Sequence, residues 1–353
     1  MNLLNLAPPA AADLLADWLA ARGEVAYRVR QILPRLWQRP VGSWRDATDV
    51  PGGVADALAR EFPLPRLELA RQQVSADGTV KFLWALGDGQ AIESVWIPEG
   101  RRRTLCISSQ VGCALGCVFC ATGRMGFHRH LEPWEIAGQV REMLLDPSLG
   151  KPTNAVFMGM GEPLHNWTAV DTALTILNHP QGLGLGARHI TVSTVGLLPG
   201  LQRLAARPEQ FRLAVSLHAP TSARRRAIMP VEKKYHLTDL MAVVRQFKRR
   251  VTFEYVLILG LNDAAEDAHA LAELAKPLGA LVNLLPLHPG GAPGLVPVPL
   301  AGLRRFAALL RERGASVSVR RSRGLDISAA CGQLRVETER ARQIGADQHA
   351  GVE

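Results

Sequence analysis

Three cysteines that lie close together in the chain have a spacing that suits iron–sulfur chemistry. They follow the pattern C-x3-C-x2-C and are Cys113, Cys117 and Cys120. Three thiolates in one turn can hold three irons of a [4Fe–4S] cluster and leave the fourth iron open to a ligand. Gly112 and Gly116 let the backbone wrap closely around such a cluster. The alternative is a zinc site completed by His128 or His130, although zinc sites usually pair their cysteines as two C-x2-C groups.

The other two cysteines, Cys106 and Cys331, lie outside this pattern. Five cysteines in all are too few and too unevenly spaced for a secreted disulfide framework. No apolar run reaches the roughly 18 to 20 residues that a membrane span needs. The N-terminus lacks a basic region and carries Asp13 and Asp17, so it does not resemble a signal peptide. We therefore expect a cytoplasmic protein with no membrane partner.

The basic residues are mostly arginines and occur in clusters. The formal net charge is +9, from 41 Lys and Arg against 32 Asp and Glu. The clusters are Arg101–Arg103, Arg224–Arg226, Lys233–Lys234, Lys248–Arg250 and Arg320–Arg323. Such clustering is typical of proteins that bind a polyanion such as nucleic acid, although solvated helix surfaces give the same pattern.

The apolar pattern divides the chain into a small N-terminal unit and a larger α/β unit. Residues 1–75 predict a helical unit, with apolar faces over 11–22 and 27–37. Residues 76–103 predict a β-hairpin linker, with strands over 79–84 and 91–97. From residue 104 to about 335, strand and helix patterns alternate, and residues 336–353 form a tail.

The larger unit has the pattern of serial β–α units. Seven segments predict its strands: 104–108, 155–158, 189–193, 212–217, 251–259, 281–287 and 316–320. Between them lie amphipathic helices, one of which we expect Asn166 to cap. Such units form a barrel or a doubly wound sheet, and both bind ligands at the carboxyl ends of the strands. Polar and glycine-rich segments mark these ends at Gly159–Glu162, Ser193–Thr194, Ser216–His218 and Pro286–His288.

These motifs resemble those of the radical-SAM superfamily, which binds its cluster through C-x3-C-x2-C and meets the amino end of S-adenosylmethionine (SAM) with a segment like GMGEP at 159–163. A closer resemblance covers residues 20 to 335. It includes CISSQVGC at 106–113, ATG at 121–123, SLHAP at 216–220 and RGLDISAACGQL at 323–334. With these segments the chain is similar to the radical-SAM ribosomal RNA adenine-C2 methyltransferases, whose antibiotic-resistance relative acts at C8.

The resemblance implies a fold and a set of cofactors. The fold is a partial (β/α)6 TIM-like barrel over residues 104–335, with a small N-terminal helical domain that binds RNA. The cofactors are one [4Fe–4S] cluster, held by Cys113, Cys117 and Cys120, and SAM, with two molecules used per turnover. A donor such as flavodoxin or ferredoxin supplies the electron, and the enzyme works as a monomer.

The same resemblance implies roles for the two remaining cysteines. Carbon C2 of adenine is a poor nucleophile, so polar methyl transfer fails there, whereas radical addition can succeed. In the family, the cysteine at the position of Cys331 is first methylated and its methylene radical then adds to the base. The cysteine at the position of Cys106 attacks the sulfur of the adduct and releases the product as a disulfide forms. Glu93 matches the residue that accepts the ring proton. Otherwise Cys106 and Cys331 are packing residues and Glu93 is a solvated carboxylate.

The family's SAM-binding positions also occur in this chain. They are Gly161, Glu162, Ser193, Ser216, Leu217 and His218. One position departs from the family, because His288–Pro289 stands where Asn-Pro is usual. A histidine can still hydrogen-bond a nucleoside through a ring nitrogen, so we include His288 among the SAM contacts.

The implied substrate is an adenosine of 23S rRNA near the peptidyl-transferase centre, and in many members also the adenine beside the tRNA anticodon. The target base must leave its stack to reach the cofactor. Three alternatives remain open. One is methylation at C8. Another is a radical-SAM activase that makes a glycyl radical and does not need Cys331. The third is a non-catalytic iron–sulfur RNA-binding protein.

Overall fold

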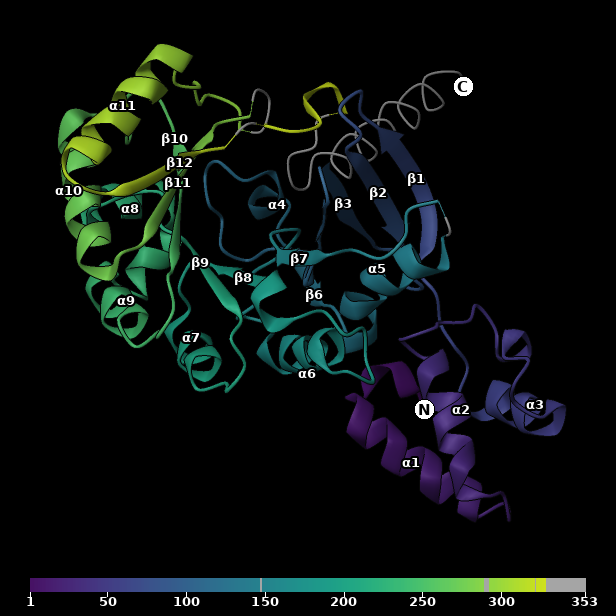
Figure 1. Cartoon of the computed structure of the whole chain (residues 1–353). Helices are drawn as coiled ribbons and strands as arrows, with labels where there is room; N and C mark the ends of the chain where they lie inside the picture. The colour runs from purple at the N-terminus through teal and green to yellow at the C-terminus, as the bar shows by residue number, and fades with distance from the viewer. Residues whose placement is uncertain (147, 289–291, 321, 328–353) are drawn as a thin grey trace, which may run out of the picture.

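A single ten-stranded sheet runs through most of the molecule (Figure 1). The computed structural model describes residues 1–146, 148–288, 292–320 and 322–327. In spatial order the strands are β1 (Glu68–Val74), β2 (Val80–Ala85), β3 (Ala91–Glu99), β4 (Arg102–Cys106), β7 (Asn154–Phe157), β8 (Ile190–Thr194), β9 (Arg212–Ser216), β10 (Thr252–Leu257), β11 (Leu281–Pro286) and β12 (Ser316–Val319). Because β4 pairs with β3 and β7, the sheet stays open, with β1 and β12 at its edges.

The part from β4 to β12 is the predicted α/β fold. All its neighbouring strands are parallel, and the seven predicted strands are confirmed with ends that agree to within two residues. Helices fill the six connections: α5 (Pro133–Leu145), α6 (Trp167–Asn178), α7 (Leu198–Ala205), α8 (Ser222–Ile228) with α9 (Leu237–Val244), α10 (Ala265–Ala275) and α11 (Leu300–Glu312). The faces predicted from helical spacing are the buried ones, as for Val170, Leu174 and Leu177 of α6. The result is a (β/α)6 partial barrel.

Strand β1 corrects the prediction that residues 1–75 are helical. It pairs antiparallel with β2, which in turn forms the predicted hairpin with β3. Most side chains of β1 are exposed, so its sequence has no alternation of apolar and polar residues to mark it as a strand. Backbone pairing and its place at the sheet edge define it instead. The hairpin therefore extends the barrel sheet rather than standing apart from it.

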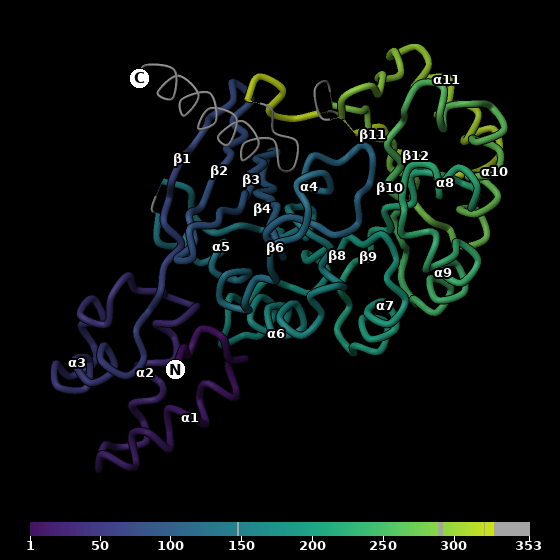
Figure 2. The backbone as a smooth tube through the Cα atoms, turned by 180° about the vertical axis from the view of Figure 1, so that it is seen from behind, coloured from purple at the N-terminus to yellow at the C-terminus, as the bar shows by residue number. Residues whose placement is uncertain are grey.

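The N-terminal unit contains α1 (Pro8–Ala20), α2 (Val29–Ile32) and α3 (Gly52–Glu61) and lies at one end of the molecule (Figure 2). The predicted second helix over 27–37 is wrong as a continuous element. It breaks into α2 and two 3-10 turns, because Pro34 has no N–H to donate to a preceding carbonyl. No helix in the described part of the chain is long and apolar enough to cross a membrane.

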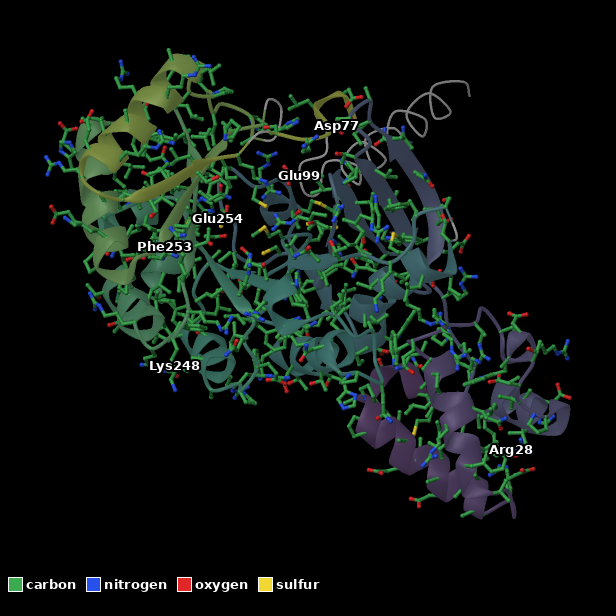
Figure 3. All side chains as sticks on the ribbon, viewed as in Figure 1. Arg28, Asp77, Glu99, Lys248, Phe253 and Glu254 are labelled. Carbon is green, nitrogen blue, oxygen red and sulfur yellow. The ribbon has the colours of Figure 1, made fainter. Side chains whose placement is uncertain are left out.

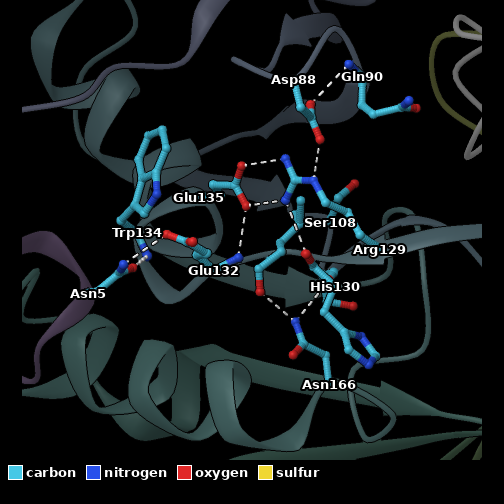
Figure 4. Close-up of polar contacts among 12 residues, drawn as sticks. Asn5, Asp88, Gln90, Ser108, Arg129, His130, Glu132, Trp134, Glu135 and Asn166 are labelled. Carbon is cyan, nitrogen blue, oxygen red and sulfur yellow. Dashed lines mark hydrogen bonds and ion pairs between the residues drawn. The ribbon is translucent and has the colours of Figure 1, made fainter. Parts of the chain in front are cut away.

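Polar contacts fasten this unit and a small second sheet to the barrel (Figure 4). The side chain of Asn5 accepts a hydrogen bond from the Trp134 backbone N–H (3.1 Å) and donates one to Glu132 (2.8 Å) at the start of α5. The second sheet, β5 (Gln110–Gly112) with β6 (Phe127–His130), was not predicted. Asn166 does not cap α6 through its side chain; its amide donates to two backbone carbonyls, those of Ser109 (2.9 Å) and Leu131 (2.7 Å).

Candidate active site at the carboxyl ends of the parallel strands

A cavity of about 390 Å³ opens at the carboxyl ends of the parallel strands. Nine of the residues predicted to act as ligands contribute to its wall: Cys113, Cys117, Cys120, Gly161, Glu162, Ser193, Ser216, His218 and His288. The cysteines come from the segment after β4, Ser193 and Ser216 from the ends of β8 and β9, and the others from the loops after β7, β9 and β11. The fold thus brings together residues up to 175 positions apart, where parallel α/β folds hold their ligands.

The cysteine turn is shaped by backbone contacts that only glycine permits. Gly112 has φ 72°, and a β-carbon there would lie 2.0 Å from the carbonyl oxygen of Gly126. The next N–H, that of Cys113, donates to the same oxygen (2.8 Å). Burial raises the pKa of the Cys113 thiol to about 12 and also raises the pKa of Cys117. These thiols therefore ionise only when a cation takes the place of the proton, which is the behaviour of structural metal ligands.

The donor set fits a cluster better than a single metal ion. Among the described residues, no three His, Cys, Asp or Glu side chains converge closely enough to hold one ion. In a [4Fe–4S] cluster each cysteine binds a different iron, so the sulfurs stay apart. His130, a candidate zinc ligand, instead faces Gln110, whose Nε2 lies 3.0 Å from its Nδ1.

The glycine-rich segment after β7 holds a buried carboxylate. Gly161 has φ 97°, and a β-carbon there would come within 2.8 Å of three side-chain atoms of Gln110. The Gln110 side-chain oxygen accepts a hydrogen bond from the Glu162 N–H (2.7 Å). The Glu162 carboxylate accepts from the N–H groups of Leu164 (3.1 Å) and Val195 (3.0 Å). Burial outweighs these bonds and raises the pKa of Glu162 to about 7. This carboxylate suits a cationic ligand group such as the ammonium of SAM.

The predicted SAM positions on β8 and β9 lie side by side. The hydroxyl oxygens of Ser193 and Ser216 are 3.5 Å apart. His218 has φ 54°, and its Nδ1 accepts from the Val256 N–H (3.0 Å). Burial, with the charge of Arg225, lowers the pKa of His218 to about 3. The ring is therefore neutral, with Nε2 as the donor. The side chain of Leu217 packs in the hydrophobic core, away from the cavity wall.

Glu93 and Cys106 lie on one face of the sheet. Cys106 of β4 pairs with Val95 of β3, so their side chains point to the same side, and Glu93, two residues before Val95, shares that side. Val95 lines the cavity. Glu93 is only 3% exposed and Cys106 only 6%, so Glu93 is not a solvated carboxylate. Cys331 lies outside the described residues.

The sequence analysis did not predict that Lys81 and Arg225 are buried. Lys81 of β2 pairs with Val95, so it shares the face of Glu93 and Cys106, and it is fully buried. Arg225, assigned to an exposed basic cluster, is also fully buried and forms an ion pair with Glu232 at 2.5 Å. In that cluster Arg224, which is partly exposed, forms a 2.6 Å ion pair with Asp267, so Arg225 alone is removed from the expected polyanion surface. The position of Lys81 inside an apolar strand was a signal that its side chain is buried. The burial of Arg225 left no such signal, because a pairing between two side chains does not change the apolar pattern of the sequence.

The fold and site have counterparts among known proteins. A family described as the Radical SAM superfamily matches residues 107–274. A radical SAM methyltransferase from Sphaerobacter thermophilus, known as a crystal structure, is 42% identical and covers 94% of this chain and 98% of its own, with a TM-score of 0.87. Together with the cavity, these matches define an α/β radical-SAM protein, a family that uses SAM and a [4Fe–4S] cluster.

Curated relatives narrow the class. A protein from Gemmatimonas aurantiaca named probable dual-specificity RNA methyltransferase RlmN is 57% identical over 99% of this chain and 98% of its own length. The dual-specificity RNA methyltransferase RlmN of Anaeromyxobacter dehalogenans is 45% identical over 92% of this chain and 90% of its own. Identity at this level over nearly the whole length shows that this chain belongs to the RlmN family of radical-SAM RNA methyltransferases.

Proposed function

We propose that this protein methylates C2 of an adenine in 23S rRNA, and the adenine beside the tRNA anticodon, through a methylated cysteine. One observation carries the proposal: a single cavity gathers the three cysteines, the buried Glu162 and a residue of the sheet face that holds Glu93 and Cys106. The relatives' name, with its dual specificity, supports two RNA substrates. An rRNA and tRNA substrate places the reaction in the cytoplasm.

The cofactors supply one thing that no side chain can. When bound, the cluster and SAM generate a carbon radical strong enough to remove a hydrogen atom from a methyl group. We assign the cluster to Cys113, Cys117 and Cys120, and the ammonium of SAM to Glu162. Ser193, Ser216, His218 and His288 then contact the rest of SAM, together with the backbone at Gly161 and Leu217. Cys331 would accept its methyl group from one SAM, and a second SAM, bound beside the cluster, would supply the radical, with an electron from a donor such as flavodoxin or ferredoxin.

The remaining steps belong to the chain's own residues. Cys331 carries the methyl group to the base, and Glu93 accepts the proton that the ring carbon loses. Once the adduct has also lost one electron, which the cluster would take back, the Cys106 thiolate attacks the sulfur of Cys331 and a disulfide forms. The carbon–sulfur bond breaks, and the carbon keeps its electron pair and takes up a proton, which leaves a methyl group on the released RNA. The position of Glu93 supports its role, because this buried carboxylate shares a sheet face with Cys106 and with Val95, which lines the cavity. We further propose that the protein acts as a monomer.

We assign RNA binding to the helical part of residues 1–75, which precedes β1, with the hairpin of residues 76–103 leading into the barrel at 104–335 and residues 336–353 as a tail. The outer surface of this N-terminal helical part carries groups of the kind that bind RNA. Tyr27 is 53% exposed, and the Arg28 guanidinium lies 4.9 Å from the centre of its ring (Figure 3). Aromatic rings and guanidinium planes are the usual stacking partners of unpaired bases.

Two cysteine variants test the mechanism. The purified wild-type protein should carry a methyl group on Cys331 by mass spectrometry. Cys331→Ala should abolish RNA methylation and form no covalent RNA–protein species. Cys106→Ala should still add to the base and then stall as a crosslink through Cys331 that survives denaturant. Normal turnover by Cys106→Ala, with no crosslink, contradicts the resolving role.

The same preparations test the cofactor and the product. Anaerobic reconstitution should load about four irons and four sulfides per chain, and stoichiometric zinc without iron uptake contradicts the cluster. Formation of 5′-deoxyadenosine separates an enzyme from a non-catalytic RNA-binding protein. Mass spectrometry of the nucleosides separates 2-methyladenosine from the C8 isomer.

A further inference from the structure

The segment after β12 crosses from one edge of the sheet to the other. Strands β1 and β12 are the two edges of the ten-stranded sheet. After β12 the chain does not stay beside it; residues 322–327, here called the strap, reach the turn between β1 and β2 (Figures 1 and 2). Arg320, Ser322 and Arg323 line the cavity on the way, and so does Thr79 at the end of the turn. The strap therefore forms part of the cavity's rim.

Two carboxylates fasten the strap to the turn. Asp326 accepts hydrogen bonds from the Ser75 hydroxyl (2.6 Å) and the Ala76 N–H (3.0 Å). In the opposite direction, Asp77 of the turn accepts one from the Gly324 N–H (3.0 Å). Asp77 lies next to Ser75 and Ala76, the donors to Asp326, and Asp326 lies two residues after Gly324, the donor to Asp77. Each segment therefore holds the other, and we call this pair of contacts the clasp. Asp77 is labelled next to the strap in Figure 3.

These bonds involve ionised groups. The hydrogen bond from Ser75, followed by that from Ala76, lowers the pKa of Asp326. Burial raises the pKa of Asp77, but the hydrogen bonds from Gly324 and Thr79 outweigh it and hold that pKa well below its ordinary value. Both groups are therefore carboxylates near neutral pH, and charge-assisted hydrogen bonds are about twice as strong as neutral ones. Asp326 is mostly exposed, so its bonds order the strap rather than build the core.

The clasp matters because it holds the chain a short distance before Cys331. This cysteine comes four residues after Ile327, the last described residue of the strap. Without the clasp, the strap keeps a 3.7 Å ion pair between the partly exposed side chains of Arg323 and Glu99, and such exposed pairs contribute little. The nearest firmly held element is then the end of β12 at Val319, twelve residues before Cys331. The effective concentration of a tethered group falls roughly as the −3/2 power of tether length, so this threefold lengthening lowers it about fivefold.

We propose that Asp77 and Asp326 are positioning residues that set the point from which Cys331 reaches the cavity. They touch neither substrate nor cofactor and act only through the segment that leads to the cysteine. The inference rests on the proposed role of Cys331 as methyl carrier.

The test uses the reconstituted holoprotein and the double variant Asp77→Asn/Asp326→Asn, which keeps side-chain shape and one acceptor oxygen at each position. Cluster content and SAM affinity should equal those of the wild type, because neither residue contacts those sites. In protein produced without its cluster and then reconstituted, so that Cys331 starts unmethylated, single-turnover methyl loading followed by mass spectrometry should slow by up to about fivefold. Asp326→Glu alone, which keeps the charge, should retain most of the rate. Asp239→Asn, an exposed aspartate of α9, should change nothing.

A second measurement reports proximity without catalysis. Protein produced without its cluster, in which Cys331 has not been methylated, is reconstituted and equilibrated anaerobically without SAM in glutathione redox buffers, and the Cys106–Cys331 disulfide is quantified by mass spectrometry. The double variant should need about fivefold more oxidising buffer for half formation, because its two thiols meet less often. Equal loading rates and equal disulfide formation in wild type and double variant overturn the positioning role. If the wild type gains no methyl group on Cys331 and forms no disulfide, the proposed function fails instead, and the inference falls with it.

Discussion

Two buried glutamates that lie near the N–H and the carbonyl of the same residue, Val195, differ in how the fold compensates their charge. The Val195 N–H donates to the carboxylate of Glu162 (3.0 Å), while the Val195 carbonyl accepts from Arg225 (2.5 Å), which is paired with Glu232. Glu162 is 3% exposed and Glu232 is fully buried. No basic side chain in the part of the chain that the structure describes forms an ion pair with Glu162.

The two carboxylates differ in pKa for this reason. Burial raises the pKa of Glu162 to about 7 because neutral donors alone compensate it. Burial also acts to raise the pKa of Glu232, but hydrogen bonds from Ser222, Leu237 and Arg225, with the Arg225 charge, outweigh it and lower that pKa. A buried charge is costly without an oppositely charged partner. Glu232 has such a partner in Arg225, whereas Glu162 would gain one only from a bound cationic ligand. The difference separates a structural carboxylate from one kept for a ligand.

Removing the partner of Glu232 should have the largest effect. Arg225→Met leaves a buried carboxylate uncompensated and should lower the free energy of unfolding by about 3–5 kcal/mol. Urea denaturation of the apoprotein measures this. Arg226→Met, at the exposed neighbouring position, is the matched control and should change stability little. Arg225→Met/Glu232→Leu should recover most of the loss, and a double variant as unstable as the single one contradicts the pairing argument.

Removing the charge of Glu162 should weaken ligand binding. Glu162→Gln loses a charge-assisted contact with the ammonium of SAM, worth about 1.5–3 kcal/mol or roughly 10- to 150-fold in affinity. Calorimetry with the reconstituted protein measures this. Glu232→Gln serves as the comparison at the other carboxylate and should leave SAM affinity much less affected. Equal losses of affinity in both variants would mean that the two glutamates do not differ in function.

The smallest expected effect is the change in SAM affinity for each pH unit. Below its pKa of about 7, Glu162 is protonated and cannot pair with a cation, so SAM affinity should fall about tenfold, or 1.4 kcal/mol, per pH unit and stay level above pH 7. The same raised pKa stabilises the folded apoprotein at low pH, and this contribution should be lost as pH rises from about 4.5 to about 7. Glu162→Gln should show neither dependence. A flat wild-type profile between pH 5.5 and 7 would show that Glu162 ionises normally.

Much of the fold and the site could be predicted from sequence because the signals are local. The seven parallel strands and the buried face of α6 follow from periodicity, and the cysteine spacing predicts a cluster because its three ligands share one turn. Strand β1 could not be predicted in this way, because an exposed edge strand is defined by the partner it pairs with. Asn166 looked like a cap because capping is a local rule, whereas its amide bonds two backbone carbonyls from segments 57 and 35 residues away.

The sequence by itself determined the residue types that do the chemistry: three cysteines at cluster spacing, a glycine-rich turn whose backbone only glycine can adopt, and strands that end in polar residues. Only the tertiary structure decided how charges are shared among them. Ionic partners such as Arg225 with Glu232 and the clasp of Asp326 on Ser75 join segments 7 and 251 residues apart, and the pKa of Glu162 depends on burial by elements distant in the chain. Electrostatic energy depends on distance and on exclusion of water, and neither quantity exists until the chain has folded.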